Sequence, residues 1–418
     1  MKVLYFIPKT KGGILPFFSQ ELIDSIAAIA EVHVMTPRAE ESPHTGVAKT
    51  HWLSAYRLMI GRNRKRFDKV VGDVNPDIIH IIGSWDVTAY FIARWADMYR
   101  IPVVVSPLKG LAPWNTLRSY WLRRLPQLLL YQTAVISGAH ALHASCRQEQ
   151  SFVTGACRYP LMFPRRPWNT RIAVIEDPRL DGDISTADAA SAMVALYNKV
   201  SDSNPFMRMT PEDRTAESAL LRAGLAQDAI SAAISPETRM LLMQMSDASW
   251  RRILLHAADE QIADEVTRGA LVMQLKRKSI VIENTGRFEQ VRRTDTRSLA
   301  GIPPLVKRRK AERLAGRCRD EAAARICMMT VNVAQMMRRG TLCRRHLADL
   351  YTALRFGNCD ENALRLMLRR LGAAKTAARL MQIMGETIGL EQGFMPLEPL
   401  DDRGTQHIRD ILFNLKIQ

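Results

Sequence analysis

The chain has 418 residues, of which 47% are hydrophobic and 24% are charged, a composition typical of a globular protein. No apolar run approaches the roughly 20 residues that span a bilayer, and the apolar N-terminal stretch is too short for a signal peptide. The formal net charge of +17 predicts an anionic partner, which charge alone does not identify as nucleic acid, a phosphorylated substrate or an anionic membrane.

From Met1 to about Asp181, short β-rich apolar runs alternate with helical patterns. The predicted strands are KVLYFIP, EVHVMTP, DIIHII, IPVVVSP, AHALHAS and RIAVIED. The predicted helices are FFSQELIDSIAAIA, TAYFIARWADMYR and a long stretch that ends near Ser137. This alternation is typical of βαβ units. We therefore expect an α/β fold over residues 1–181: a doubly wound, parallel-sheet, Rossmann-like domain.

The pattern changes after this domain. We interpret the polar, Ala-rich residues 182–203 as a connector and expect residues 204–418 to form a mostly α-helical domain. TPEDRTAESALLRAGL has a Thr cap followed by Pro and acidic residues, as helix starts do. Only SIVIEN, at 279–284, still resembles a strand.

Two runs are densely basic, GRNRKRF at 61–67 and VKRRKAER at 306–313. We interpret each as a solvated face or loop rather than a specific site. Basic and aromatic residues do not alternate as they do on RNA-binding platforms, so nucleic acid is not an expected partner. The six cysteines form no CxxC pair, so we predict no metal site and no disulfide framework, and we expect a cytoplasmic protein.

In doubly wound sheets, ligands bind beyond the carboxyl ends of the strands. The chain places backbone-shaping and polar residues after three predicted strands, and we expect these three loops to converge on one crevice. The candidate substrate-binding residues are Gly12, Gly13, His80, Trp85, Ser106, Lys109, Gly110 and Trp114.

Several of these residues have two interpretations. Gly12 and Gly13 could let the backbone approach a phosphate or a sugar, or they could form a simple turn. His80 could bind a sugar or act as a base, or it could be a core histidine. Lys109 could bind an anionic ligand, or it could pair with a protein carboxylate and close the site. Catalytic residues are unknown, and His80 and Lys109 are the candidates.

Residues 112–136 carry Trp and Leu at helical spacing with arginines among them. A helix with this pattern could lie at an anionic membrane surface. The alternative is a helix that packs on the sheet and leaves its arginines in water.

Four stretches resemble, in order, the N-terminal, acceptor-side domain of GT-B glycosyltransferases of the family 4 type: PKTKGGI, DIIHIIGSW, VVVSPLKGLAPW and AHALHASCRQEQ. RIAVIEDPRLD stands where the family has its interdomain hinge. The resemblance covers about residues 1–181. It implies a GT-B N-terminal fold and, in the turn after AHALHA, structural positioning as the role of His143 and Glu149.

The resemblance also implies a hexosyltransferase of cell-surface polysaccharide or glycoconjugate assembly. Such an enzyme moves a sugar from a nucleotide-sugar, with no further cofactor, to a saccharide or lipid-linked acceptor. It works in the cytoplasm or on the inner membrane face.

The chain departs from the family in two respects. Leu108 and Lys109 stand where the family has His and Gly, and the family's second Rossmann-like domain is not recognisable after residue 181. Two functions therefore remain open. One is a transferase whose nucleotide site comes from the helical half or from a partner transferase chain. The other is a non-catalytic module that binds a glycan or a partner.

Overall fold

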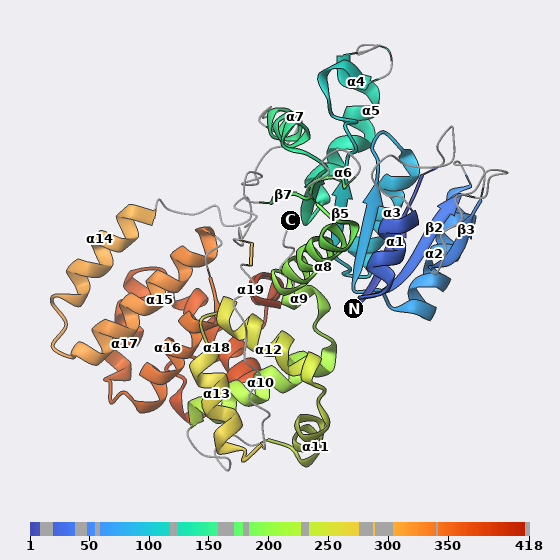
Figure 1. Ribbon diagram of the computed structural model, residues 1–418. Coiled ribbons are helices and arrows are strands. Elements are labelled where there is room, and N and C mark those ends of the chain that lie inside the picture. The colour runs from blue at the N-terminus through green and yellow to red at the C-terminus, as the bar shows by residue number, and fades with distance from the viewer. Residues whose placement is uncertain are drawn as a thin grey trace. The chain divides into compact units, whose positions relative to one another are not determined.

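The computed structural model describes residues 1–8, 20–37, 48–54, 59–117, 122, 124–157, 171–178, 184–226, 234–275, 287–288, 304–339 and 342–413 (Figure 1). The chain divides into two compact units. The first is Met1–Arg208 with Glu283–Gln290, and the second is Met209–Ile282 with Val291–Gln418.

A seven-stranded sheet forms the centre of the first unit. Its order is β3-β2-β1-β4-β5-β6-β7 and every neighbouring pair is parallel. The strands are β1 (Lys2–Phe6), β2 (Glu31–Pro37), β3 (Lys49–Leu53), β4 (Ile78–Ile82), β5 (Val103–Ser106), β6 (Ala141–Ala144) and β7 (Ile172–Val174). The expected doubly wound sheet is confirmed, because runs such as IIHII and VVVS are buried along their whole length, as central parallel strands require.

Helices cover both faces of this sheet. The helices of the first unit are α1 (Gln20–Ala27), α2 (Ile60–Val74), α3 (Val87–Met98), α4 (Pro113–Leu117), α5 (Leu125–Gln127), η2 (the π-helical turn Leu128–Gln132), α6 (Thr133–Gly138), α7 (Arg147–Cys157), α8 (Thr186–Asp202) and α9 (Pro205–Arg208). Side chains of α2, α3, α6 and α7 share one core cluster with one face of the sheet, and α1 and α8 share a second cluster with the other.

The division of the chain differs from the predicted one at residues 182–203. The described part of this segment is a connector in the prediction but forms α8 in the structure, within the first unit. Its apolar residues recur at helical spacing, and Met193, Tyr197 and Val200 are fully buried against the sheet. The first unit therefore extends to Arg208 rather than to residue 181.

The second unit is helical throughout its described residues, as expected. Its elements are α10 (Pro211–Ala226), α11 (Pro236–Gln244), α12 (Asp247–Asp259), α13 (Ala263–Val272), α14 (Pro304–Ala315), α15 (Glu321–Arg339), α16 (Arg344–Phe356), α17 (Glu361–Arg370), α18 (Ala374–Ile388), η5 (Gln392–Phe394) and α19 (Arg403–Phe413). The predicted Thr cap is present, because Thr210 and Asp213 exchange hydrogen bonds at the start of α10. The strand-like run 279–284 lies outside the described residues.

Two glycines let α10 and α13 touch backbone to backbone. A β-carbon added at Gly224 would lie 1.9 Å from the Glu265 carbonyl oxygen, and one added at Gly269 would lie 1.9 Å from that of Leu220. Any larger residue at either position would force the two helices apart. This close packing places residues of α10 and α13 on one wall of a cavity in the second unit.

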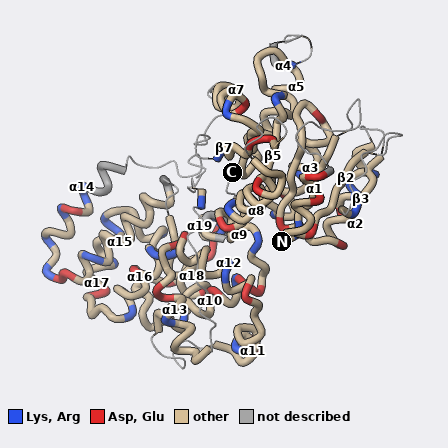
Figure 2. Tube along the Cα trace, in the orientation of Figure 1, with Lys and Arg blue, Asp and Glu red and all other residues tan. Residues whose placement is uncertain are grey.

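Charge is spread over both units rather than gathered in one place (Figure 2). The run 61–67 lies on α2, where Arg64 pairs with Asp68 at 2.6 Å, and acidic residues intersperse the basic ones along the helices of the second unit. No described helix is both long and apolar enough to cross a membrane.

Candidate functional site

A chain of hydrogen bonds runs through the core beneath the carboxyl ends of the central strands. Tyr5 Oη lies 2.6 Å from Tyr197 Oη, which lies 2.6 Å from His80 Nδ1. His80 Nε2 and His143 Nδ1 each lie 2.7 Å from Ser106 Oγ. These five residues, called the buried relay below, come from β1, α8, β4, β5 and β6, and all are at most 1% exposed.

The direction of the relay follows from the carbonyl at its end. His143 Nε2 lies 3.2 Å from the Ile175 carbonyl oxygen, which can only accept, so Nε2 carries the proton. His143 Nδ1 then accepts from the Ser106 hydroxyl, which in turn accepts from His80 Nε2. His80 Nδ1 accepts from Tyr197, and Tyr197 accepts from Tyr5. When both imidazoles are neutral, each hydrogen bond of the relay therefore has one defined donor and one defined acceptor.

Burial keeps every member of the relay uncharged. It lowers the pKa of His80 well below its usual value, with a further contribution from the charge of His143. Burial also lowers the pKa of His143 to about 4, against weaker opposing effects from its hydrogen bond to Ile175 and from Glu149 and Asp177. The pKa values of Tyr5 and Tyr197 are raised by burial. The relay is therefore a neutral structural element at pH 7.

The relay contains two of the predicted site residues. His80 and Ser106 are 0% exposed and their side chains bond to each other, so neither reaches a ligand at the surface. His80 is the core histidine of the alternative interpretation. Gly12 and Gly13 lie outside the described residues.

The loops that follow β4 and β5 interlock above the relay, as the predicted convergence requires for these two loops. Trp85 Nε1 donates to the Gly110 carbonyl oxygen at 2.6 Å, and Ser84 Oγ donates to that of Pro107 at 3.1 Å. A β-carbon on Gly110 would lie 1.6 Å from Ser84 Oγ, so this position accepts only glycine unless the loops move. Trp85 therefore holds the loops together, and Arg124 covers its ring at 4.6 Å from the centroid.

This rim is held in a strained conformation. Trp85, Leu108 and Lys109 have φ values of 63°, 51° and 59°, in the left-handed region that disfavours side chains with a β-carbon. Such strain persists only where surrounding contacts impose it, and it concentrates at functional sites. Here the Glu149 carboxylate accepts from Lys109 N at 2.6 Å, and the Gln132 side chain accepts from Trp85 N at 2.8 Å.

Glu149 links this rim to α7, in agreement with its expected structural role. Its second carboxylate oxygen accepts from the Ser145 amide at 2.8 Å and from the Ser145 hydroxyl at 2.6 Å. Both oxygens of the Glu149 carboxylate thus accept hydrogen bonds from backbone amide or hydroxyl donors. The Lys109 side chain is half-buried, and no carboxylate among the described residues pairs with it to close the site.

A second exposed cation lies near Glu149. Arg147, in the first turn of α7, lines a cavity of about 370 Å³ at the carboxyl end of β7, together with residues that include Glu176 and Asp188. No described residue forms an ion pair with Arg147. Sequence reasoning missed this residue and this cavity, because the lining comes from separate segments around α7, β7 and α8. Among the described residues, no cluster of His, Cys, Asp or Glu side chains could hold a metal ion.

In the segment predicted to contact a membrane, the described elements are α4 and then α5, η2 and α6, which follow one another directly. Leu122, Leu129 and Leu130 are 92%, 71% and 75% exposed, and Trp114 is 54% exposed. These four residues, called the apolar patch below, face solvent rather than the sheet, although Leu128 packs inward.

Comparison with known proteins finds a match over five of the seven strands of this sheet. Residues 18–157, which include β2 to β6 and the interlocked loops, match the family model of the glycosyl transferase 4-like domain. No curated protein sequence matches the chain. Residues 18–157 of the first unit are therefore similar to the glycosyl transferase 4-like domain, a domain of the GT-B type.

Proposed function

We propose that this chain is a glycosyltransferase of cell-surface polysaccharide or glycoconjugate assembly. It transfers, or helps to transfer, a sugar from a nucleotide-sugar to a saccharide or lipid-linked acceptor. The observation that carries this proposal is the Lys109 ammonium, which pairs with no described residue and lies on a strained rim within the residues that match the glycosyl transferase 4-like domain. Donor and lipid-linked acceptor both carry phosphates, and an ammonium on this rim would bind such a group.

The backbone around Lys109 supports a binding role for its side chain. Glu149 fixes the amide of Lys109, and Asn115 Nδ2 donates to its carbonyl oxygen at 3.0 Å, so the residue is held from both sides. A conformation fixed in advance reduces the entropy lost when a ligand binds. Arg147 offers a second cation at the first turn of α7, where the helix terminus also favours an anion.

We propose that this protein acts in the cytoplasm, at the inner face of an anionic membrane. The apolar patch supplies side chains that could enter the interface, and the sequence around it contains Arg118, Arg123 and Arg124 to meet acidic headgroups. Of these, Arg124 lies over the Trp85 ring, which connects the patch to the rim. Membrane contact would then bring a lipid-linked acceptor toward Lys109.

A transfer assay tests the function. The full chain is incubated with radiolabelled nucleotide-sugars and with polyprenyl phosphates or polyprenyl diphosphate-linked saccharides in anionic vesicles. We expect labelled sugar to appear in the lipid fraction, and Lys109→Ala to reduce this transfer by tenfold or more. Specific binding without transfer would favour the non-catalytic module instead. Neither binding nor transfer across the panel would refute both functions.

Vesicle co-sedimentation tests the membrane contact separately. The double variant Leu129→Ser and Leu130→Ser should lose most binding to vesicles of phosphatidylglycerol. Leu366→Ser is the matched control, because Leu366 is also exposed, at 50%, but lies in the second unit. Equal loss of binding in the control and in the double variant would contradict this assignment.

A further inference from the structure

The second unit contains a cavity of about 690 Å³ that the function proposed above does not use. Its lining residues come from α10, α13, α15 and α16, with Gly357 beyond the end of α16. This volume is within the range of small-molecule binding sites. The backbone contact between α10 and α13 fixes one wall, so the cavity is a product of the fold rather than of loops.

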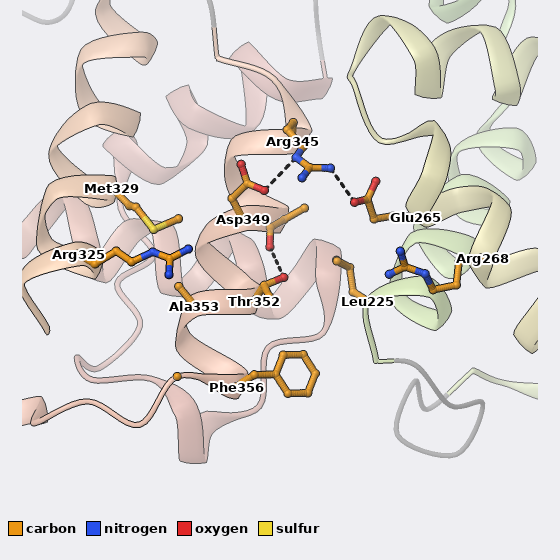
Figure 3. A pocket seen from close by; sticks show the side chains of 12 residues that line it. Leu225, Glu265, Arg268, Arg325, Met329, Arg345, Asp349, Thr352, Ala353 and Phe356 are labelled. Atoms are coloured by element: carbon orange, nitrogen blue, oxygen red, sulfur yellow. Dashed lines mark hydrogen bonds and ion pairs between the residues drawn. The ribbon is translucent and has the colours of Figure 1, made fainter. Parts of the chain in front are cut away.

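The charges that line this cavity are arranged in two groups (Figure 3). At one side, Arg345 is bracketed by two carboxylates, with Nη1 2.7 Å from Glu265 and Nε 2.8 Å from Asp349. Farther along, Arg325 extends from α15 and Arg268 from α13, and their guanidinium groups point toward the space between the two helices. The three arginines outnumber the two acids, so the lining is positive.

The guanidinium groups of Arg268 and Arg325, called the two outer arginines, have N–H donors that a ligand could use. Arg325 makes no ion pair or hydrogen bond with any described residue. Arg268 makes only a long hydrogen bond, from Nη1 to the Gly224 carbonyl oxygen at 3.5 Å. Guanidinium groups bind phosphate and carboxylate groups through paired N–H donors. Because they stand on opposite sides of the cavity, each would take its own anionic group.

Glu265 holds Arg345 at one side of the cavity. It is 8% exposed and lines the cavity, and its Oε1 accepts from Arg345. Its other oxygen, Oε2, is buried and has no hydrogen-bond partner among the described residues.

We infer that this cavity binds a small molecule that carries two anionic groups. One anionic group meets Arg268 and the other meets Arg325. Phe356 and Met329 supply the apolar contacts. This inference does not rest on the glycosyltransferase function.

Calorimetric titration of the full chain tests it, with fructose 1,6-bisphosphate as the probe and fructose 6-phosphate and fructose as comparisons. We expect saturable binding of the bisphosphate, at least tenfold weaker binding of the monophosphate, and no binding of the neutral sugar. Absence of saturable binding of the bisphosphate, or equal binding of all three sugars, would overturn the proposal.

Variants locate the site. Arg325→Met should weaken binding of the bisphosphate by at least tenfold without lowering the melting temperature, because Arg325 is exposed and makes no hydrogen bond or ion pair with any described residue. Arg369→Met is the matched control, since Arg369 is an exposed arginine of α17 outside the cavity. Equal weakening in both variants would show general attraction to positive charge and would refute the assigned cavity.

Discussion

The two units each bury a polar cluster, and the two clusters use opposite chemistry. The buried relay of the first unit is neutral, and a single carbonyl at Ile175 sets its direction. The second unit instead buries an ionic cluster, in which Glu217 is 0% exposed and meets His256 Nδ1 at 2.7 Å and Arg344 Nη1 at 2.5 Å.

The pKa values express this difference. Burial alone would raise the pKa of Glu217, but the charges of Arg344 and His256 outweigh it and lower that pKa. Burial dominates in the relay and keeps both histidines neutral. In a parallel sheet, neutral polar side chains can hydrogen-bond to side chains of neighbouring strands. Between helices, a buried polar side chain instead meets long side chains that extend from other helices. The two clusters should therefore respond differently to mutation and to pH.

The largest loss of unfolding free energy is expected from a mutation in the ionic cluster. Arg344→Met removes one charge and leaves Glu217 buried with half of its partners, which typically costs about 3–5 kcal/mol of unfolding free energy. Glu361→Gln breaks the exposed pair with Arg365 in the same unit and should cost less than about 1 kcal/mol. Urea unfolding of the two variants measures the contrast, and similar losses would contradict the described burial of the cluster.

A smaller loss of unfolding free energy is expected from a mutation that interrupts the relay. Ser106→Ala removes the hydroxyl that joins His80 to His143, at about 1–3 kcal/mol for each buried nitrogen left without its partner. Ser137→Ala is the control, because Ser137 is only partly buried and its only described side-chain bond is 3.5 Å long. Chemical unfolding measures both, and a Ser106→Ala variant as stable as the control would disprove the relay.

The relay also predicts a pH dependence. The folded pKa of His143, about 4, lies below the unfolded value of 6.5, so the unfolded state binds the proton first as pH falls. The contribution of His143 to stability is complete above pH 6.5 and is lost progressively down to about pH 4. Between pH 6.5 and 5 the loss is about 2 kcal/mol, at about 1.4 kcal/mol per pH unit. Calorimetric melting should show a shallower loss in His143→Asn, and an unchanged slope would contradict a neutral His143.

The sequence predicted the elements whose residues are buried on every side. IIHII and VVVS read as strands because they are continuous apolar runs, but KTHWL did not, because β3 lies at the sheet edge and is partly exposed. α8 was interpreted as a connector because alanines form much of its surface. Tyr197 of α8 is buried because it packs against strands of the sheet, and these strands are distant from α8 in the sequence.

The candidate site was predicted in part for the same reason. Motifs after β4 and β5 marked the interlocked loops, since each motif is local. No local signal separates His80, in the core, from Lys109, on the rim. The cavity between α13 and α15 was missed because Arg268 and Arg325 are 57 positions apart in the sequence, within helices whose packing depends on Gly224 and Gly269.

The central claim is that Lys109 is held on the rim for a phosphate-bearing ligand, and calorimetric titration of Lys109→Ala tests it most directly. The panel consists of nucleotide-sugars and polyprenyl phosphates. Because the ammonium pairs with no described residue, the melting temperature should stay nearly unchanged while binding weakens by about 1.5–3 kcal/mol, the value of a lost charged hydrogen bond. Equal affinity of wild type and variant for every ligand, or a variant with a much lower melting temperature, would contradict the account.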